Sequence, residues 1–571
     1  MRKALGITYG VEDSPPLAVN ILSGVQHVGL TSIYLVFPTL VVQAAGGSAD
    51  TAAAVVSLTL ITLAIATVLQ AITVGRVGSG YLCQPDASVL YFVPSLVAAK
   101  QGGLAAVFGM TIAAGLFEAA IARVLPRMRV LFPPEIAGLV VLLAGVSTGI
   151  VGLRTALGAG AQVAVSPSAN DLGIALATLA IMVALNVWGR GPLRLYCVLI
   201  GMAAGYALTG AAGDLSHPNA VAADMAAGPW FAFPDLGHLG WSFDPSLILP
   251  FAVAAVAASL KVMGNVTTCQ KASDVQWVRP DMRSISRGVV ADGLGTAVAG
   301  VLGTQGLSSS TGAIGLATAT GVMSRSVTWS IAALLLVLAF LPGLGRLFYL
   351  MPRPVAGAAL VFASTFIVIN GLQIMTSRLL DARKTLIIGL ALVFGLAVEM
   401  FPGMLAILPP AARQAIGSTL VLGTLVGLAM NLLFRIGLRQ TVTMTVQPGA
   451  VDGDALDQFL DEHGAHWGAR RDVIARARFN LAQAIDTLAH SGPASGPLAV
   501  EASFDEFSFD VRVSYDGPPL ELPATRPSSD EVMDAEDGER KLAGYLLRRS
   551  ADRVTATHRA GRSTLAFHFD H

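Results

Sequence analysis

The segments FPPEIAGLVVLLAGVSTGIVGL (residues 132–153) and MPRPVAGAALVFASTFIVINGL (residues 351–372) align without a gap at an offset of 219 residues. Proline and glycine recur at matched positions: Pro133 with Pro352, Ala137–Gly138 with Ala356–Gly357, and Gly152–Leu153 with Gly371–Leu372. Chance similarity between apolar helices does not readily produce such matches. Each segment is also long enough to cross a bilayer, which takes about 20 apolar residues. The pair therefore predicts an internal repeat of membrane spans.

The composition supports a membrane protein with a soluble appendage. Of the 571 residues, 54% are hydrophobic and 13% are charged, whereas a soluble protein of this size carries about 25% charged residues. Residues 1–440 have a net charge of +8 and residues 441–571 a net charge of −8. We therefore expect a transmembrane domain over 1–440, a linker over 441–454 and a cytoplasmic domain over 455–571.

Hydropathy predicts fourteen spans, which we number in chain order. They lie near 17–42, 51–72, 79–99, 103–124, 131–153, 171–188, 193–212, 246–268, 287–303, 308–323, 327–343, 350–374, 384–401 and 416–437. The two repeated segments are spans 5 and 12. Because they are seven spans apart, an odd number, they enter the membrane in opposite senses. The expected fold is an α-helical polytopic membrane protein built as a 7+7 inverted repeat, as in many secondary transporters.

Spans 3 and 10 are short and interrupted. Their sequences contain GSGYLCQPDAS (78–88) and GTQGLSSSTGAIG (303–315), which are too rich in glycine and serine for continuous helices. Broken backbone at membrane depth is tolerated only where protein buries it or where it lines a cavity. These two breaks are again seven spans apart, so they mark the expected substrate region.

Basic residues predict the orientation. Sixteen Lys and Arg residues fall in the predicted inner loops and five in the outer loops, and the longest outer loop (214–245) has none. The positive-inside rule then places both termini in the cytoplasm, with the chain in the cell inner membrane. No phosphate-binding GxxxxGK[ST] motif occurs, so ATP-driven transport has no support.

Several of these segments resemble the nucleobase–ascorbate (xanthine/uracil permease) transporter family. The resemblance covers about residues 15–440. It rests on Gln26–His27 in span 1, SRGVVADGLGTAVAGVLGT (286–304) in span 9 and MPRPVAGAALVF (351–362) in span 12. The resemblance implies a core domain of spans 1–4 and 8–11 and a gate domain of spans 5–7 and 12–14. It also implies short strands at the start of spans 3 and 10, and elevator transport, usually by a homodimer.

Two departures from the family pattern lie in the implied substrate site. The family has a substrate-holding Glu in span 8, three residues before a Gly; aligned on Gly264, that position is Lys261 here. In span 10, Gly312 and Ala313 replace an acid or amide and an Asn. We therefore expect an electropositive pocket that binds an anionic organic solute. The backbone N–H groups of residues 309–312 would contribute to it, because helix starts bind anions.

The role of Lys261 leaves three alternatives open. A lysine inside a span costs roughly 2.5–3.5 kcal/mol on insertion scales, so it needs a cavity, a partner or access to the interface. Lys261 would face the substrate, snorkel to the cytoplasmic interface, or pair structurally with Asp86 or Asp292. If it faces the substrate, its fixed charge would replace a coupling cation, and exchange or uniport would follow.

Each of the other candidate site residues has both a substrate-binding and a structural interpretation. His27 would contact substrate or fix span 1, and Asp86 is expected to cap the half-helix of span 3 rather than bind substrate. The serines of span 10 would bind substrate or satisfy freed backbone groups. The full candidate substrate-binding set is Lys261, His27, Gln26, Gln84, Asp86, Ser309, Ser310, Thr311, Gly312, Ala313, Gly264 and Asn265.

The acidic tail is predicted to be a small α/β domain. DVIARARFNLAQAIDTLAH (472–490) has helical periodicity and LAVEASFDEFSFDVRVSYDG (498–517) alternates like two strands. The tail resembles the ATP-binding domain of anti-sigma-factor-type serine kinases. The family's catalytic Glu, Mg-binding Asn and adenine-reading Asp fall on Ala482, Asp486 and Tyr515, and its glycine-rich lid is reduced to Gly544. The resemblance implies the fold without ATP hydrolysis, in a regulatory, dimer-stabilising or passive tail.

The sequence as a whole favours a secondary or facilitative transporter of a small organic solute, either nucleobase-like (purine, xanthine or urate type) or another organic anion. The alternative is a transporter-derived membrane sensor that signals through its tail. We expect no enzyme activity, cofactor, metal or nucleic-acid partner, because no nucleophile–base set or metal-ligand cluster is present. The three cysteines also lack metal-ligand spacing. The expected partners are a small-molecule substrate, the lipid bilayer, a second copy of the chain and a possible cytoplasmic regulator.

Overall fold

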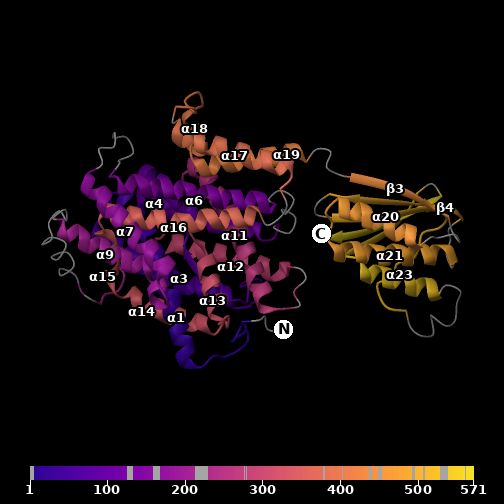
Figure 1. Ribbon diagram of the computed structural model, residues 1–571, viewed down its shortest axis with the longest axis horizontal. Coiled ribbons are helices and arrows are strands. Elements are labelled where there is room, and N and C mark those ends of the chain that lie inside the picture. The colour runs from indigo at the N-terminus through magenta and orange to yellow at the C-terminus, as the bar shows by residue number, and fades with distance from the viewer. Residues whose placement is uncertain are drawn as a thin grey trace. The chain divides into compact units, whose positions relative to one another are not determined.

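The computed structural model describes residues 6–124, 133–158, 168–212, 229, 231–238, 240–275, 277, 280–376, 380–401, 403–435, 440–447, 453–490, 495–505, 508–527, 538–559 and 561–570. The chain divides into two compact units, residues 1–431 and 432–571 (Figure 1). Five of the arginines used to predict the orientation lie outside the described residues: Arg127, Arg129, Arg279, Arg378 and Arg439. Most of the predicted outer loop 214–245 and part of the linker 441–454 also lie outside them.

Among its described residues, the first unit is helical apart from two short strands. Its first half contains α1 (Leu17–Ser32), η1 (Ile33–Leu35), α2 (Val36–Ala44), α3 (Ala49–Ala71), β1 (Pro85–Ala87), α4 (Val89–Ile121), α6 (Pro134–Ala156), α7 (Ala169–Trp188), α8 (Pro192–Leu195) and α9 (Cys197–Ala211). Its second half contains η2 (Pro245–Leu247), α11 (Ile248–Ser273), α12 (Met282–Val301), β2 (Leu307–Ser309), α13 (Thr311–Thr320), α14 (Val327–Ala339), α15 (Pro342–Tyr349), α16 (Arg353–Met375), α17 (Ala382–Met400), α18 (Pro410–Ile416) and α19 (Thr419–Phe434).

Each of the fourteen predicted spans overlaps one of these helices, or a helix with a short strand. Spans 3 and 4 share α4, which is broken where Gly103 adopts a left-handed conformation (φ 66°). By length and composition, seven of the described helices could cross a membrane, or eight if α14 and α15, which are bent by 75°, count as one span. The chain is therefore a polytopic membrane protein, while the count of fourteen stays a prediction.

The two broken spans meet at a small antiparallel sheet. Pro85 of β1 lies opposite Ser309 of β2, and Ala87 lies opposite Leu307. A helix starts directly after each strand: α4 after β1 and α13 after β2. The short strands expected at the start of spans 3 and 10 are thus present. Their mutual hydrogen bonds satisfy backbone groups that an interrupted helix would leave unpaired at membrane depth.

The repeated helices α6 and α16 pack against each other through glycines (Figure 1). A Cβ built on Gly138 would lie 2.4 Å from the backbone nitrogen of Met375, and one on Gly371 would lie 2.4 Å from that of Leu142. At the other end of the pair, a Cβ on Gly357 would lie 2.4 Å from the nitrogen of Ala156. The positions 138 and 357 are related by the 219-residue offset, as are 156 and 375. Aligned positions of the two copies therefore make equivalent contacts. Each copy contributes a glycine at the same aligned position, which lets the two backbones approach closely.

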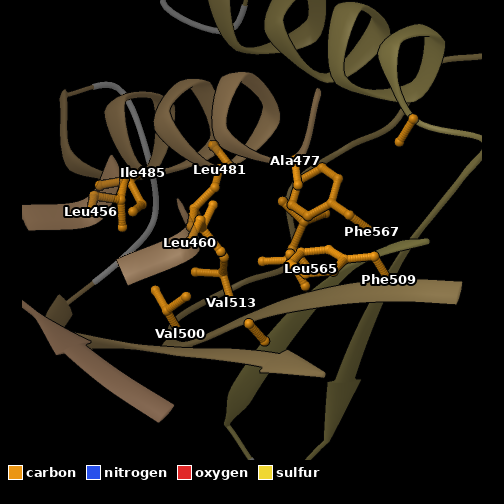
Figure 2. Close-up of a cluster of buried hydrophobic side chains, with 14 of the residues drawn as sticks. Leu456, Leu460, Ala477, Leu481, Ile485, Val500, Phe509, Val513, Leu565 and Phe567 are labelled. Atoms are coloured by element: carbon orange, nitrogen blue, oxygen red, sulfur yellow. The ribbon is translucent and has the colours of Figure 1, made fainter. Parts of the chain in front are cut away.

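The second unit is a layer of helices on a five-stranded antiparallel sheet. Its elements are β3 (Gln440–Val446), α20 (Gly453–His466), α21 (Arg471–His490), β4 (Ser495–Phe504), β5 (Ser508–Asp516), α23 (Gly538–Ser550), β6 (Arg553–Arg559) and β7 (Arg562–Asp570). The strand order is β3-β4-β5-β7-β6. The helices cover one face, where Leu481 of α21 points towards Val513 of β5 and Ile485 of α21 lies beside Leu456 of α20 (Figure 2).

The predicted helix and strand pairs of the tail are present, but the expected linker is partly wrong. Residues 440–446 form β3, which pairs along its length with β4 from Gln440–Phe504 to Val446–Leu498. The α/β unit therefore begins before residue 441. The alternation of polar and apolar residues in QTVTMTV is the signal that would have revealed this strand.

The glycine crossing of α6 and α16 predicts a large penalty for a larger side chain. Gly138→Leu would drive its side chain into the backbone of α16, so we expect a loss of ~3 kcal/mol of stability and a clearly lower Tm. Thermal melting of the detergent-purified protein, followed by size-exclusion chromatography, measures this. Gly389→Leu on α17 is the control, because a Cβ there meets no atom within 4 Å. Equal melting of both variants would contradict the packing described here.

Candidate functional site

Lys261 lies in the middle of α11, inside the protein. Its side chain is 10% exposed, and its Nζ lies 3.9 Å from Oδ1 of Asp86 on β1, whose side chain is 4% exposed. A buried ammonium needs such a partner, because transfer of an unpaired charge out of water is very costly. The snorkelling alternative is therefore wrong in this structure, and the pairing alternative describes the observed contact.

The charge around Lys261 differs from the sequence prediction. The ammonium does not stand alone, because Asp86 faces it directly and Asp292 of α12 also interacts electrostatically with it. The expected electropositive lining is thus offset by carboxyl groups in this conformation. At 3.9 Å, however, the ammonium is beyond normal hydrogen-bonding distance from Asp86 and keeps donor capacity for another acceptor.

A chain of polar side chains runs beside this ion pair. Asn265, one helical turn after Lys261, donates through Nδ2 to the carbonyl (3.0 Å) and the Oγ (2.8 Å) of Ser309. Thr311 donates through Oγ1 to Oδ1 of Asn265 (3.0 Å), and Asn370 of α16 donates through Nδ2 to Oγ1 of Thr311 (3.4 Å). This chain links α11, the start of α13 and the repeated helix α16.

Asn370 is a site residue that the sequence analysis missed. It is half-buried in a long apolar span, immediately before Gly371. A polar residue inside an apolar span is by itself a signal of a functional site. The aligned position in the first repeat is Val151, so Asn370 also breaks the similarity between the two copies.

The same region has an open side. A Cβ placed on Gly264 of α11 or on Gly315 of α13 would meet no atom within 4 Å, and one on Gly312 would have Leu30 as its nearest neighbour at 3.5 Å. Most glycines in the helix crossings lack such space. Gly264, Gly312 and Gly315 thus leave open space beside Asn265 and the start of α13.

His27 and Gln84 form a buried structural link rather than an open lining. The Nδ1 of His27 donates to Oε1 of Gln84 (2.8 Å), and Nε2 of Gln84 donates to Oγ1 of Thr31 (2.7 Å). Gln84 immediately precedes β1, so the link ties the strand to α1. Gln26 is half-buried one residue before His27 and is not part of this link.

The caps of the two half-helices are serines. Ser88 accepts a hydrogen bond from the Leu90 N–H (3.2 Å), so the expectation that Asp86 caps the half-helix of span 3 is wrong. Ser310 caps α13 by accepting from the N–H of Ala313 (3.4 Å), which is buried. The backbone N–H of Ser310 donates a hydrogen bond to the carbonyl oxygen of Gln84 (2.8 Å), so it is already used within the protein. Only part of the expected anion-binding run 309–312 is therefore available to a ligand.

Two tail positions aligned with nucleotide-binding residues of the kinase family, Tyr515 and Gly544, have packing roles in the second unit. Tyr515 is buried in the core of the second unit, where its Oη accepts a hydrogen bond from the Leu520 N–H (2.9 Å). Burial raises the pKa of the Tyr515 phenol. A Cβ on Gly544 would lie 2.0 Å from the carbonyl oxygen of Glu521, so this glycine permits close packing of α23. Among the described residues, no group of three or more His, Cys, Asp or Glu side chains could hold a metal ion.

The fold and the site define the class of protein as a helical membrane transporter. They combine a membrane unit of many helices with two paired broken spans and buried ionisable residues. Comparison with known proteins gives the family: residues 19–404 match the model Xan_ur_permease, described as the Permease family. The chain therefore belongs to this family of xanthine/uracil permeases, and it is a transporter-family protein rather than an enzyme. The family resemblance inferred from spans 1, 9 and 12 is confirmed.

Individual relatives cover most of the membrane unit. Xanthine permease XanP of Escherichia coli (strain K12) is 31% identical over 443 residues, which cover 75% of this chain and 94% of the relative. The putative purine permease of Clostridium perfringens is 28% identical, covering 76% and 94%. Uric acid permease PucJ of Bacillus subtilis (strain 168) is 25% identical, covering 74% and 93%.

Solved transporters of other families are matched more distantly. The transmembrane domain of a cyanobacterium bicarbonate transporter, BicA, matches with a TM-score of 0.46 at 15% identity, covering 74% of this chain and 99% of that chain. The anion transporter Slc26a9 in its inward-facing state matches with a TM-score of 0.49 at 12% identity, covering 77% and 72%.

The buried ion pair predicts non-additive effects of mutation on stability. Lys261→Gln leaves Asp86 buried without its cation, so we expect a loss of about 3–5 kcal/mol, and Asp86→Asn should be similarly costly. The double variant Lys261→Gln/Asp86→Asn removes both charges and should recover most of that loss. Thermal melting of the purified variants in a double-mutant cycle measures the coupling. Additive losses would show that the two groups do not interact.

Proposed function

We propose that the chain is a secondary transporter of a small purine-like solute, which binds between α11, the start of α13 and α16. The observation that carries this proposal is the open-sided polar chain Asn265–Thr311–Asn370 beside two half-helices that begin at paired strands. Relatives that match over most of the membrane unit are named as xanthine, purine and uric acid permeases, which supports a solute of this class.

The polar chain suits the edge of a purine ring. Asn side chains offer both donors and an acceptor, and a threonine hydroxyl offers one of each. A heterocycle whose edge alternates carbonyl and N–H groups can exchange hydrogen bonds with Asn265 and Asn370. The space beside Gly264 and Gly315 accepts its flat face.

Lys261 favours the anionic form of such a solute. A deprotonated urate or xanthine that enters beside Asn265 would compete with Asp86 for the ammonium. A hydrogen bond to a charged group contributes about 1.5–3 kcal/mol, so the ammonium can set selectivity between anionic and neutral solutes. Asp86 would then act as the internal counterion that holds Lys261 when the site is empty.

The proposed movement of the solute uses the division into core and gate domains that the family resemblance implies. The site lies where core elements (α11, α13) meet a gate helix (α16). The tight α6–α16 crossing would keep the gate rigid while the core, with the two half-helices, moves across the membrane as an elevator. This mechanism, the inverted repeat of fourteen spans, the homodimer and the cytoplasmic placement of both termini belong to the proposal.

The sensor alternative gives the second unit the active role. A transporter-derived receptor would bind the same solute and signal through the α/β domain without carrying it. A regulatory role of that domain is compatible with transport as well, so only flux separates the two functions.

Uptake by purified protein in liposomes tests the proposal. We expect accumulation of radiolabelled xanthine or urate that excess unlabelled solute abolishes. Binding of both solutes without flux would support the sensor and contradict transport.

Variants at the ion pair test the predicted preference for anions. Asp86→Asn removes the competing carboxylate and should tighten urate binding, whereas Lys261→Gln/Asp86→Asn should weaken it at least about tenfold, the equivalent of 1.4 kcal/mol. Lys100→Gln, at an exposed lysine of α4, is the matched control and should leave the apparent affinity unchanged. Unchanged affinity in the double variant would rule out a substrate-facing Lys261.

A further inference from the structure

We infer that a phospholipid with a primary-ammonium headgroup, of the phosphatidylethanolamine type, binds in a cavity where α3 ends and α14 begins. The cavity has a volume of about 420 Å³, which lies within the range of about 300–1,000 Å³ for small-molecule sites. Residues 11–14 form one wall, Val68 and residues 71–74 form a second, and the start of α14, with Thr328 and Trp329, forms a third. The proposed solute site shares no residue with this lining, so the inference does not depend on the proposed transport.

The N-terminal wall is an ordered part of the fold. The backbone N–H of Met323 donates to the carbonyl oxygen of Tyr9 (2.8 Å), and that of Arg325 donates to the carbonyl oxygen of Val11 (3.1 Å). The segment therefore runs alongside the connection between α13 and α14. Its backbone hydrogen bonds hold the side chains that follow it at the cavity.

The charged lining contains both signs. Within the described part of the chain, the charged side chains at the cavity are Glu12, Asp13 and Arg325. Arg325 forms an ion pair with Glu12, and the Asp13 carboxylate accepts a hydrogen bond from the Gly10 N–H (2.7 Å). One guanidinium and two carboxylates suit a headgroup that carries a phosphate and a cation. The phosphate would lie at Arg325 and the cation at Glu12.

The chemistry of the headgroup selects among the common phospholipids. Phosphatidylglycerol has a net negative charge, which the two carboxylates would repel. The quaternary ammonium of phosphatidylcholine has no N–H group and cannot donate a hydrogen bond. A primary ammonium has three donors, as a lysine side chain has, and carboxylates accept them. Phosphatidylethanolamine therefore fits this lining best.

Thr328 adds a polar group that calls for a ligand. Its side chain is 1% exposed and lines the cavity, yet its Oγ1 has no hydrogen-bond partner among the described residues. By contrast, Thr59 and Thr62 of the neighbouring α3 each donate to a carbonyl oxygen one turn earlier (2.7 Å). A buried hydroxyl without a partner costs about 1–3 kcal/mol. A headgroup in the cavity would supply the missing partner.

A strip of exposed apolar side chains leads from the cavity along the helices. Trp329 lines the cavity and is 63% exposed, and Leu336 and Val337 follow it about two turns later on α14. Ile65 of α3, which packs against α14, is also exposed. In a membrane unit such side chains face acyl chains. Because the charged cavity continues into this strip, the ligand is expected to be an amphipathic lipid rather than a free phosphate or amine.

The same cavity wall holds the end of a half-helix. Gly321 ends α13 in a left-handed conformation (φ 70°), and its carbonyl oxygen accepts a hydrogen bond from the Thr8 N–H (2.9 Å). A lipid in the cavity would stabilise the N-terminal segment and, with it, the junction of α13 and α14. It would also raise the stability of the whole protein, because it binds the folded state alone.

Thermal melting of the full-length protein in detergent tests the headgroup preference. We expect dioleoyl-phosphatidylethanolamine to raise the Tm more than the matched phosphatidylcholine or phosphatidylglycerol. Glu12→Gln/Arg325→Gln should weaken its apparent affinity at least about fivefold and abolish the preference. Glu399→Gln/Arg154→Gln, which removes an ion pair between α17 and α6, is the matched control and should keep it. Equal shifts with all three lipids, or a preference that survives in Glu12→Gln/Arg325→Gln, would overturn the inference.

Thr328→Val separates ligand binding from a structural role. The variant removes a hydroxyl that has no partner among the described residues, so its Tm without lipid should stay the same or rise. Its Tm shift with phosphatidylethanolamine should be smaller than that of the wild type. A full lipid-induced shift in Thr328→Val would show that the headgroup does not reach the cavity.

Tryptophan fluorescence locates the bound lipid. We expect phosphatidylethanolamine with brominated acyl chains, added in small excess to the detergent-purified protein, to quench part of the emission. This quenched part should be absent from Trp329→Phe and present in Trp188→Phe, the matched control at an exposed tryptophan of α7. Quenching that is unchanged in Trp329→Phe, or equal quenching by brominated phosphatidylglycerol, would contradict a phosphatidylethanolamine site at this cavity.

Discussion

The antiparallel pairing of β1 with β2 is the constraint on which the rest of the membrane unit depends. A span that stops half-way exposes backbone groups where water cannot reach them, and these two strands satisfy each other's groups at that depth. The pairing fixes where α4 and α13 begin. It also sets Asp86 opposite Lys261 and brings Ser309 within reach of Asn265. The ion pair and the polar chain are both built on it.

Glycine-mediated contact between helices is the second organising element, and it has different consequences in two places. Between α6 and α16 it joins two long apolar helices and brings no ionisable side chains together. Between α4 and α12 the same close approach takes place beside two buried acidic residues, Glu118 and Asp292. Close packing in a membrane protein therefore also decides which polar groups meet, since side chains beside the glycines have little freedom to avoid one another.

Much of the membrane unit follows from the sequence because its signals are local. Hydropathy places the helices, and glycine-rich runs with one proline reveal both breaks. Contacts between distant residues were harder: Asp86 looked like a cap because it stands before a helix, yet Ser88 has that role and Asp86 has an ion-pair partner about 175 residues away in the chain. Asn370 and β3 were missed although each has a local signal, a polar residue inside an apolar span and the alternating pattern of QTVTMTV.

The central claim is that a purine-like solute binds where α11 and α13 face α16. A cryo-EM structure of the full-length protein with saturating xanthine tests it most directly. The account predicts ligand density beside Gly264 and Gly315, in hydrogen-bonding contact with Asn265 or Thr311, with the Lys261 ammonium turned towards the ligand. Density in another part of the protein, with the polar chain and the Lys261–Asp86 pair unchanged, would contradict it.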